Sequence, residues 1–241
     1  MIAYLLRRLG YALISILVAS LIIFLMLEVL PGDPARFMMG INATEETVAA
    51  LRQELGLNQP AFLRFFSWLG GILLGDFGTS YSYRVPVTDL LIERLAVSLP
   101  LAAMALAMTL ILALPLGLVS ARFWGTWPDT ALMTGAQVSI ALPNFWIAIL
   151  LQMMLALSFR IFPAGGFPGW QNGLQASLWA LVLPALALAI PQAAILARVG
   201  RSALVEASQQ DFMRTARAKG LSRNRALVTH AYRNASLPMF T

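Results

Sequence analysis

Residues 9–27 read LGYALISILVASLIIFLML and contain no charged side chain. The apolar run continues past Glu28 to Leu30, and about 20 such residues, each adding about 1.5 Å, cross a hydrocarbon core of about 30 Å. The whole chain is 59% hydrophobic and 12% charged, with a mean hydropathy of +0.74, which is outside the usual range of soluble domains. We therefore expect a transmembrane helix at 9–30 and lipid as the main solvent.

Further uncharged runs occupy residues 95–121, 130–159 and 161–197. The last run is too long for one span, and its first part, PAGGFPGWQNG, has the glycine and proline content of a loop. The fold class predicted from these runs is an all-α polytopic membrane protein. Its four spans are expected near residues 9–30, 97–120, 131–157 and 178–197.

The arginines predict the orientation, because short cytoplasmic loops collect Lys and Arg. Arg7 and Arg8 assign residues 1–8 to the cytoplasm. Four crossings return the chain there, and eight of its seventeen basic residues lie between Arg198 and Arg233. Residues 31–94 are then external. Residues 95–241 hold the other three spans and a cytoplasmic loop at 198–236.

Short helices are expected in the external segment. Thr44 followed by Glu45 and Glu46 is a typical helix start, and Gly56 is a typical stop. The stretch AFLRFFSWLGGILLG at 61–75 is short and broken by glycines, so an interfacial helix is expected there.

Several kinds of chemistry lack the residues they need. The chain has no cysteine and one histidine, His230, so no metal site is expected. Lys219, its only lysine, lacks the spacing of a phosphate-binding Walker A loop. Glu28 is the only ionisable residue in the predicted spans, so no buried carboxylate relay is expected. The net charge is +6, but the basic residues lie between apolar spans and not on one face of a soluble domain, which argues against nucleic-acid binding. No catalytic residue and no bound cofactor are predicted.

Neutral polar residues in the spans are candidates for a translocation path. We select Gln137, Asn144 and Gln192 as path contacts. The alternative is that such groups form hydrogen bonds between helices. Pro143, directly before Asn144, favours a path because a helix break frees backbone groups that need partners or water.

The basic loop has its own pattern. EASQQDFMRTARAK at 206–219 contains good helix formers and stops at Gly220, after which Ser222 can cap a second helix, RNRALVTHAYRNA. A helix pair hinged at a glycine predicts a docking element for an acidic cytoplasmic partner. The alternative is a loop that sets topology and contacts anionic lipid.

RTARAKGL at 214–221, with LP at 237–238, resembles the EAA loop of bacterial ABC-importer permeases, in the form seen in the dipeptide, oligopeptide and nickel permease family. The general EAA pattern has Glu where Arg214 stands and a shorter spacing from glycine to LP. Further motifs follow in the family's order: MIAYLLRRLG, LPGDPA, GDFGTSY, ERLAVSLPLA and IALPNFW.

The resemblance implies the type I membrane domain of an ABC importer, with six spans per permease. The fifth and sixth would follow Thr241, so we expect a form truncated after the fourth span and the loop. It also implies a coupling helix inserted in an ATPase subunit. The implied coupling residues are Arg214, Thr215, Ala216, Arg217, Ala218, Lys219 and Gly220.

The implied assembly lies in the bacterial inner membrane. It has two ATPase subunits that bind ATP and Mg, a second homologous permease and an external substrate-binding protein. This chain would then be a permease for di- or oligopeptides that works by alternating access and has no ATPase site of its own. Nickel or another small solute is the alternative within the family. A membrane-embedded enzyme and a lipid-binding scaffold are the alternatives from other classes.

Overall fold

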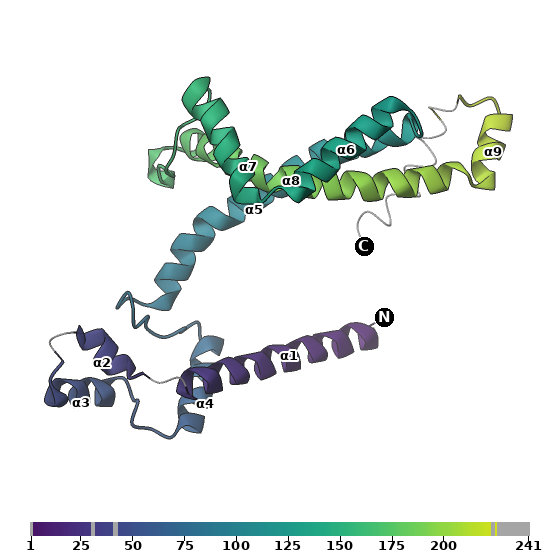
Figure 1. Cartoon of the computed structure of the whole chain (residues 1–241). Helices are drawn as coiled ribbons and strands as arrows, with labels where there is room; N and C mark the ends of the chain where they lie inside the picture. Colours follow the sequence, from purple (N-terminus) through teal and green to yellow (C-terminus); the bar gives the residue numbers. More distant parts are fainter. Residues whose placement is uncertain (1, 30–31, 41–42, 223–224, 226–241) are drawn as a thin grey trace. The chain divides into compact units, whose positions relative to one another are not determined.

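Long apolar helices dominate the computed structural model, which describes residues 2–29, 32–40, 43–222 and 225. Three helices are long and apolar enough to cross a membrane: α1 (Ile2–Val29), α5 (Val87–Arg122) and α8 (Leu174–Ser208). The chain divides into two units, residues 1–96 and 97–241, with α5 running from one into the other. Figure 1 shows the helices in chain order.

The first unit contains α1 and three shorter helices, α2 (Pro34–Met39), α3 (Glu45–Glu54) and α4 (Ala61–Leu73). Thr44 caps α3: its hydroxyl accepts a hydrogen bond from the Thr47 amide, and the Thr47 hydroxyl accepts one from the Thr44 amide. The predicted helix start is therefore confirmed. Gly56, just past the end of α3, has a φ of +67°.

Three ion pairs connect the elements of this unit, one of them between Arg36 of α2 and Glu45 of α3. Arg64 of α4 pairs with Glu28 of α1, and the Phe24 and Phe65 rings meet edge to face at 5.3 Å beside them. Arg52 of α3 pairs with Asp33, the N-cap of α2, at 2.9 Å. Burial raises the pKa of Asp33, but hydrogen bonds from Arg52 and from the Ala35 amide outweigh it, so the pKa lies below its usual value.

In the second unit the predicted third span is sharply bent. α6 (Trp127–Ala141) and α7 (Asn144–Leu151), which continues as the π-helix η2 (Gln152–Ser158), meet at an angle of 106°. Leu142 at the break is extended, as expected for a residue before proline. If the bent pair counts as one span, the described chain holds four candidate spans.

The loop before α8 folds back on the helices. It contains one short helical turn, η3 (Trp170–Asn172), in the stretch predicted to be a loop. The Gln152 amide donates to the Ala164 carbonyl, and the Phe162 and Trp179 rings stack at 4.5 Å. These contacts join the π-helix, the loop and the start of α8.

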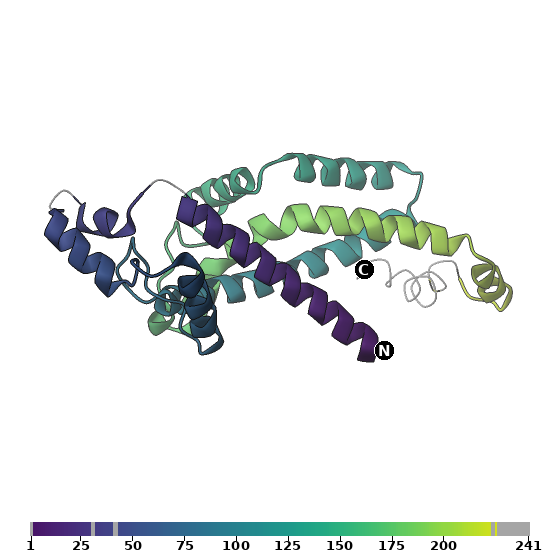
Figure 2. The same cartoon turned by 90° about the horizontal axis from the view of Figure 1, so that it is seen from below.

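The core of the second unit is α8. Both α6 and α7 contact it, and Figure 2 shows α6 lying along it. Much of its buried surface is alanine, which allows neighbouring helices to approach closely. On its α5 side, Ala113 packs with Ala193 and Ala197. A Cβ at Gly117 would lie 3.0 Å from the Ala197 carbonyl oxygen, so this crossing needs glycine.

The close crossing of α5 and α8 predicts a difference between two helix glycines. Gly117→Val would push its side chain against the α8 backbone, and overpacking of this kind costs about 1–3 kcal/mol. A Cβ at Gly135 of α6 meets no atom within 4 Å, so Gly135→Val is the matched control. We expect only Gly117→Val to lower the melting temperature of the purified transporter. Equal melting of the two variants would contradict this packing.

Candidate functional site

The candidate site is the end of the second unit where α5, α8 and the short helix α9 (Asp211–Ala218) meet. α8 ends at Ser208, and two residues later α9 begins at Asp211. The predicted continuous helix over 206–219 is therefore wrong, because the chain turns at Gln209 and Gln210. The short α9 can then lie across the ends of the long helices instead of extending α8.

Gly220 ends α9 as predicted. It has a φ of +87°, and the Leu221 amide donates to the Ala216 carbonyl at 3.3 Å. A hydrogen bond from an amide to the carbonyl five residues earlier, directly after a left-handed glycine, is the pattern of a Schellman C-cap. Leu221 also packs against the cluster that contains Ala216, which supplies the hydrophobic contact that usually accompanies this cap.

One face of α9 is buried on its own chain. Met213 and Ala216 pack with Ala121 of α5 and with Leu204 and Ala207 of α8. Ala216 is one of the implied coupling residues, and the structure has it in contact with these two helices of the same chain. The small side chains Ala121, Ala207 and Ala216 let α9 lie close to both helix ends.

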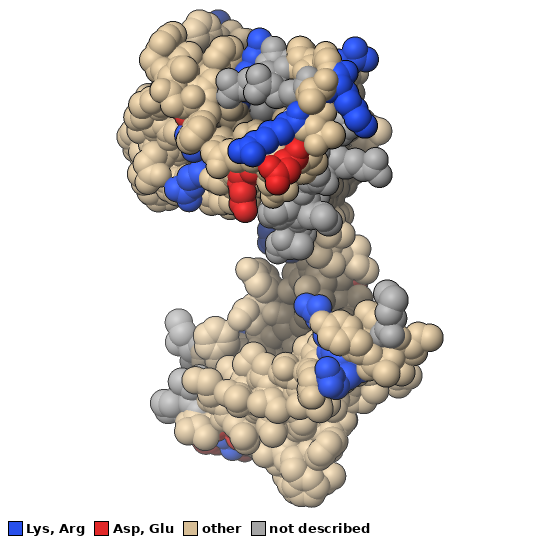
Figure 3. All heavy atoms as spheres, turned by 90° about the vertical axis from the view of Figure 1, so that its right-hand side faces the viewer, with Lys and Arg blue, Asp and Glu red and all other residues tan. Residues whose placement is uncertain are grey.

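The remaining predicted coupling residues lie on α9 or just after it. The Arg214 side chain is 82% exposed and pairs with Asp211 at 3.3 Å. The Arg217 backbone is helical. The other exposed members of the set are Thr215, Ala218, Lys219 and Gly220. Figure 3 shows basic side chains over this end of the unit, with acidic ones among them.

Of the predicted second helix, most residues, including His230, lie outside the described part of the chain. Ser222 is described, and its hydroxyl accepts a hydrogen bond from the Arg225 amide at 3.4 Å. This is the bond expected of an N-cap side chain.

A buried ion pair beside the site was missed at the sequence level. Asp129 accepts two hydrogen bonds from Arg201, both at 2.6 Å, and its side chain is only 4% exposed. The Ser120 hydroxyl also donates to Asp129, and the Gly125 amide does so at 3.0 Å. The carboxylate therefore joins the end of α5, the turn after it, the first turn of α6, and α8.

The local sequence explains how Asp129 reaches this place. Gly125, with a φ of +77°, turns the chain, and Pro128 stands in the first turn of α6, where its missing N–H costs nothing. An acidic residue in the first turn is favoured by the helix dipole. The sequence signal for this ion pair was the position of its members: Asp129 directly precedes the third apolar run, and Arg198 and Arg201 follow the fourth.

The structure does not bring the three predicted path residues together in one site. Gln137 lines a hollow of about 470 Å³ between α6 and α8, where its side-chain oxygen accepts from Arg198 at 3.3 Å. Asn144 is the first residue of α7, exposed at the bend, and Gln192 is exposed on α8. Neither of these two lines the hollow.

Fold and site together define a polytopic helical membrane protein with a short amphipathic helix docked across the ends of its long helices. Two family models match it. The description "Binding-prot-dependent transport system membrane comp, N-term" covers residues 1–102, and "Binding-protein-dependent transport system inner membrane component" covers residues 113–241. The chain belongs to this family of importer membrane subunits.

Similar proteins carry matching names. A Brucella abortus (strain 2308) protein named as a peptide transport system permease is 37% identical over 241 residues, which are 100% of this chain and 77% of the relative. The glutathione transport system permease GsiC of Salmonella choleraesuis is 34% identical, over 100% of this chain and 76% of the relative. A Sinorhizobium fredii protein named as a peptide ABC transporter permease is 35% identical, over 99% and 76%.

The resemblance noted from the motifs is therefore confirmed. The chain is a permease subunit of an ABC importer, with the type I membrane domain of that family. It is a transport subunit, not an enzyme in itself, and members of this family work in a membrane complex with ATPase subunits and a substrate-binding protein.

The Asp129 network predicts strong energetic coupling between Asp129 and Arg201. Arg201→Gln would leave a buried carboxylate without its cation, and removal of one partner of a buried pair costs about 3–5 kcal/mol. Asp129→Asn removes that charge. The double variant should therefore lose less unfolding free energy than the two single variants lose together. Thermal unfolding of the four purified transporters measures the cycle. Strictly additive losses would contradict the pairing.

Proposed function

We propose that this permease imports di- or oligopeptides and that α9 with Gly220 receives the motion of an ATPase subunit. The observation that carries the coupling role is the two-sided character of α9. Met213 and Ala216 are fixed on α5 and α8, while Arg214, Thr215 and Lys219 are exposed. A push on the exposed side is passed to two long apolar helices through packed side chains.

The peptide assignment is supported by the names of the relatives, which include peptide and glutathione permeases. In the proposed assembly, two ATPase subunits bind ATP and Mg, and a second, homologous permease completes the path. This chain contributes no ATPase site and no bound cofactor. Closure of the ATPase pair moves α9, and the spans alternate between outward and inward access. Gln137, Asn144 and Gln192 remain our proposed path contacts.

We also propose that the N-terminus and α9 face the cytoplasm and that the segment at 31–94 faces outward. The uneven distribution of arginines supports this orientation.

Because the chain has no cysteine, its orientation can be tested with single introduced thiols. Ser82→Cys should react with a membrane-impermeant maleimide in intact cells. Asn224→Cys should react only after the cells are permeabilised. The opposite labelling pattern would overturn the orientation.

The coupling role predicts that changes directly after α9 uncouple transport without preventing insertion. Gly220→Val adds a Cβ at a positive φ, at a cost of about 1–2 kcal/mol, and Lys219→Glu reverses an exposed charge. In proteoliposomes, peptide-stimulated ATP hydrolysis and uptake should fall together, by roughly fivefold to thirtyfold for Gly220→Val, the factors that correspond to that cost.

Arg122→Glu is the charge control, because Arg122 is exposed at the end of α5 and contacts the Phe123 ring. Its stimulation and uptake should match the unmodified protein, and all variants should reach equal membrane levels. Normal stimulation in both Gly220→Val and Lys219→Glu would favour the view that the basic loop only sets topology and contacts lipid.

A further inference from the structure

The hollow between α6 and α8 has the composition of an anion site. Besides Gln137, it is lined by Asp129, Thr130, Met133 and Thr134 from α6 and by Arg198 and Arg201 from α8. Hydroxyl, amide and guanidinium groups all donate hydrogen bonds. Such a set around a space of about 470 Å³ fits a small oxyanion on a larger ligand.

The charges in this hollow do not cancel. Arg201 is neutralised by Asp129, which also lines the hollow but is enclosed by its own hydrogen bonds. Arg198 has no carboxylate within salt-bridge distance among the described residues, and its recorded side-chain partner is the Gln137 oxygen at 3.3 Å. Two arginines and one aspartate leave one net positive charge at Arg198.

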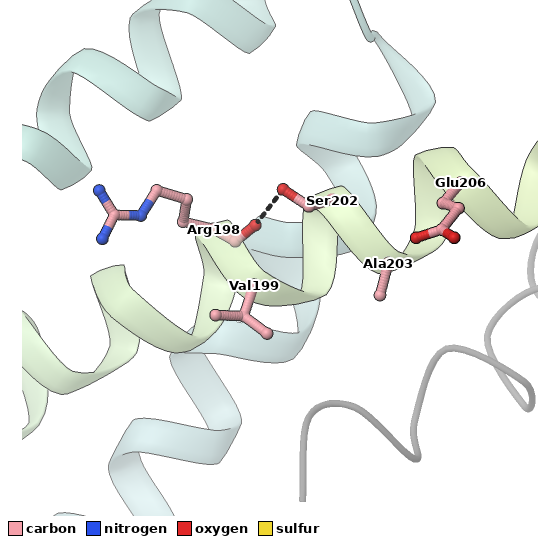
Figure 4. A pocket seen from close by; sticks show the side chains of 5 residues that line it. All are labelled: Arg198, Val199, Ser202, Ala203 and Glu206. Carbon is pink, nitrogen blue, oxygen red and sulfur yellow. Dashed lines mark hydrogen bonds between the residues drawn. The ribbon is translucent and has the colours of Figure 1, made fainter. Parts of the chain in front are cut away.

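A second hollow, of about 410 Å³, lies on α8 next to Arg198. Figure 4 shows its lining, in which the Ser202 hydroxyl donates to the Arg198 carbonyl at 3.1 Å and Glu206 follows further along the helix. The Arg198 side chain extends away from Glu206 (Figure 4). The nearest acid on this face of α8 therefore leaves the Arg198 charge uncompensated, and that charge is available to the hollow between α6 and α8.

We propose that this hollow is an inner subsite of the translocation path that binds the terminal carboxylate of the transported peptide through Arg198. A guanidinium forms paired, charge-assisted hydrogen bonds with a carboxylate, and Gln137 and Thr134 add further donors. The subsite rests on the proposed peptide-import function and deepens it. It would hold the peptide on the cytoplasmic side before release.

The test uses a thiol in the hollow. Thr134→Cys places a single cysteine in this chain, and the complete transporter is put in nanodiscs, which leave both faces accessible, without nucleotide. The probe is a methanethiosulfonate bearing a sulfonate, and modification of this chain is followed by mass. A unit charge a few ångströms away in water changes the rate for such an anion by about threefold to fivefold. Arg198→Gln should slow the probe by about that factor.

Peptide binding is then measured as protection of the thiol. Trialanine with a free carboxylate should protect at concentrations about tenfold lower than trialanine amide, the loss expected when one charge-assisted hydrogen-bond pair is removed. In Arg198→Gln the two peptides should protect equally, and Arg198→Lys should restore part of the difference. Arg122→Gln, which removes a charge elsewhere on the same unit, should behave like the Thr134→Cys parent.

Two outcomes overturn the subsite. One is equal protection by the acid and the amide in the parent. The other is a probe rate that changes when phosphatidylglycerol replaces phosphatidylcholine in the nanodiscs, while trialanine gives no protection. That result would assign Arg198 to a lipid phosphate. Uptake of trialanine by the unmodified transporter is measured in parallel. If uptake occurs without protection, only the subsite fails; if no peptide is taken up, the proposed function fails.

Discussion

The ion pair between Asp129 and Arg201 is the constraint on which the second unit depends. A carboxylate that is 4% exposed can remain ionised only if its oxygens are occupied, and here Arg201, Ser120 and the Gly125 amide occupy them. Because these groups come from α5, the following turn and α8, the charge fixes three elements at once. Separation of these helix ends would leave an uncompensated buried charge, which is strongly unfavourable.

Small side chains carry this rigidity from the ion pair to α9. Lipid supplies no hydrophobic driving force between helices, so close van der Waals packing must hold them. The α5–α8 crossing uses Gly117, Ala113 and Ala197, and α9 continues the pattern with Ala216 against Ala121. In our proposal α9 receives the motion of an ATPase subunit. It is therefore closely packed against the helices that would have to move.

Local signals in the sequence were sufficient for the fold class and for individual caps. Apolar run length predicted an all-α membrane protein, Thr44 predicted the start of α3, and Gly220 predicted the end of α9, because each depends on neighbouring residues alone. The Asp129–Arg201 pair could not be predicted, since its partners lie 72 residues apart and meet only after α6 and α8 pack. The turn at Gln209 was also missed, because both flanking segments favour helix and tertiary packing of α9 decides the break.

The 106° bend between α6 and α7 restricts what can surround it. Pro143 precedes α7 and provides no side-chain cap, and Asn144 and Phe145 at the first turn are exposed. Backbone amides at a helix start need acceptors, and hydrocarbon has none. An acyl chain is therefore a poor neighbour for this bend. We therefore expect a hydrated lumen or the polar groups of an adjoining subunit, and not bulk lipid, beside the first amides of α7.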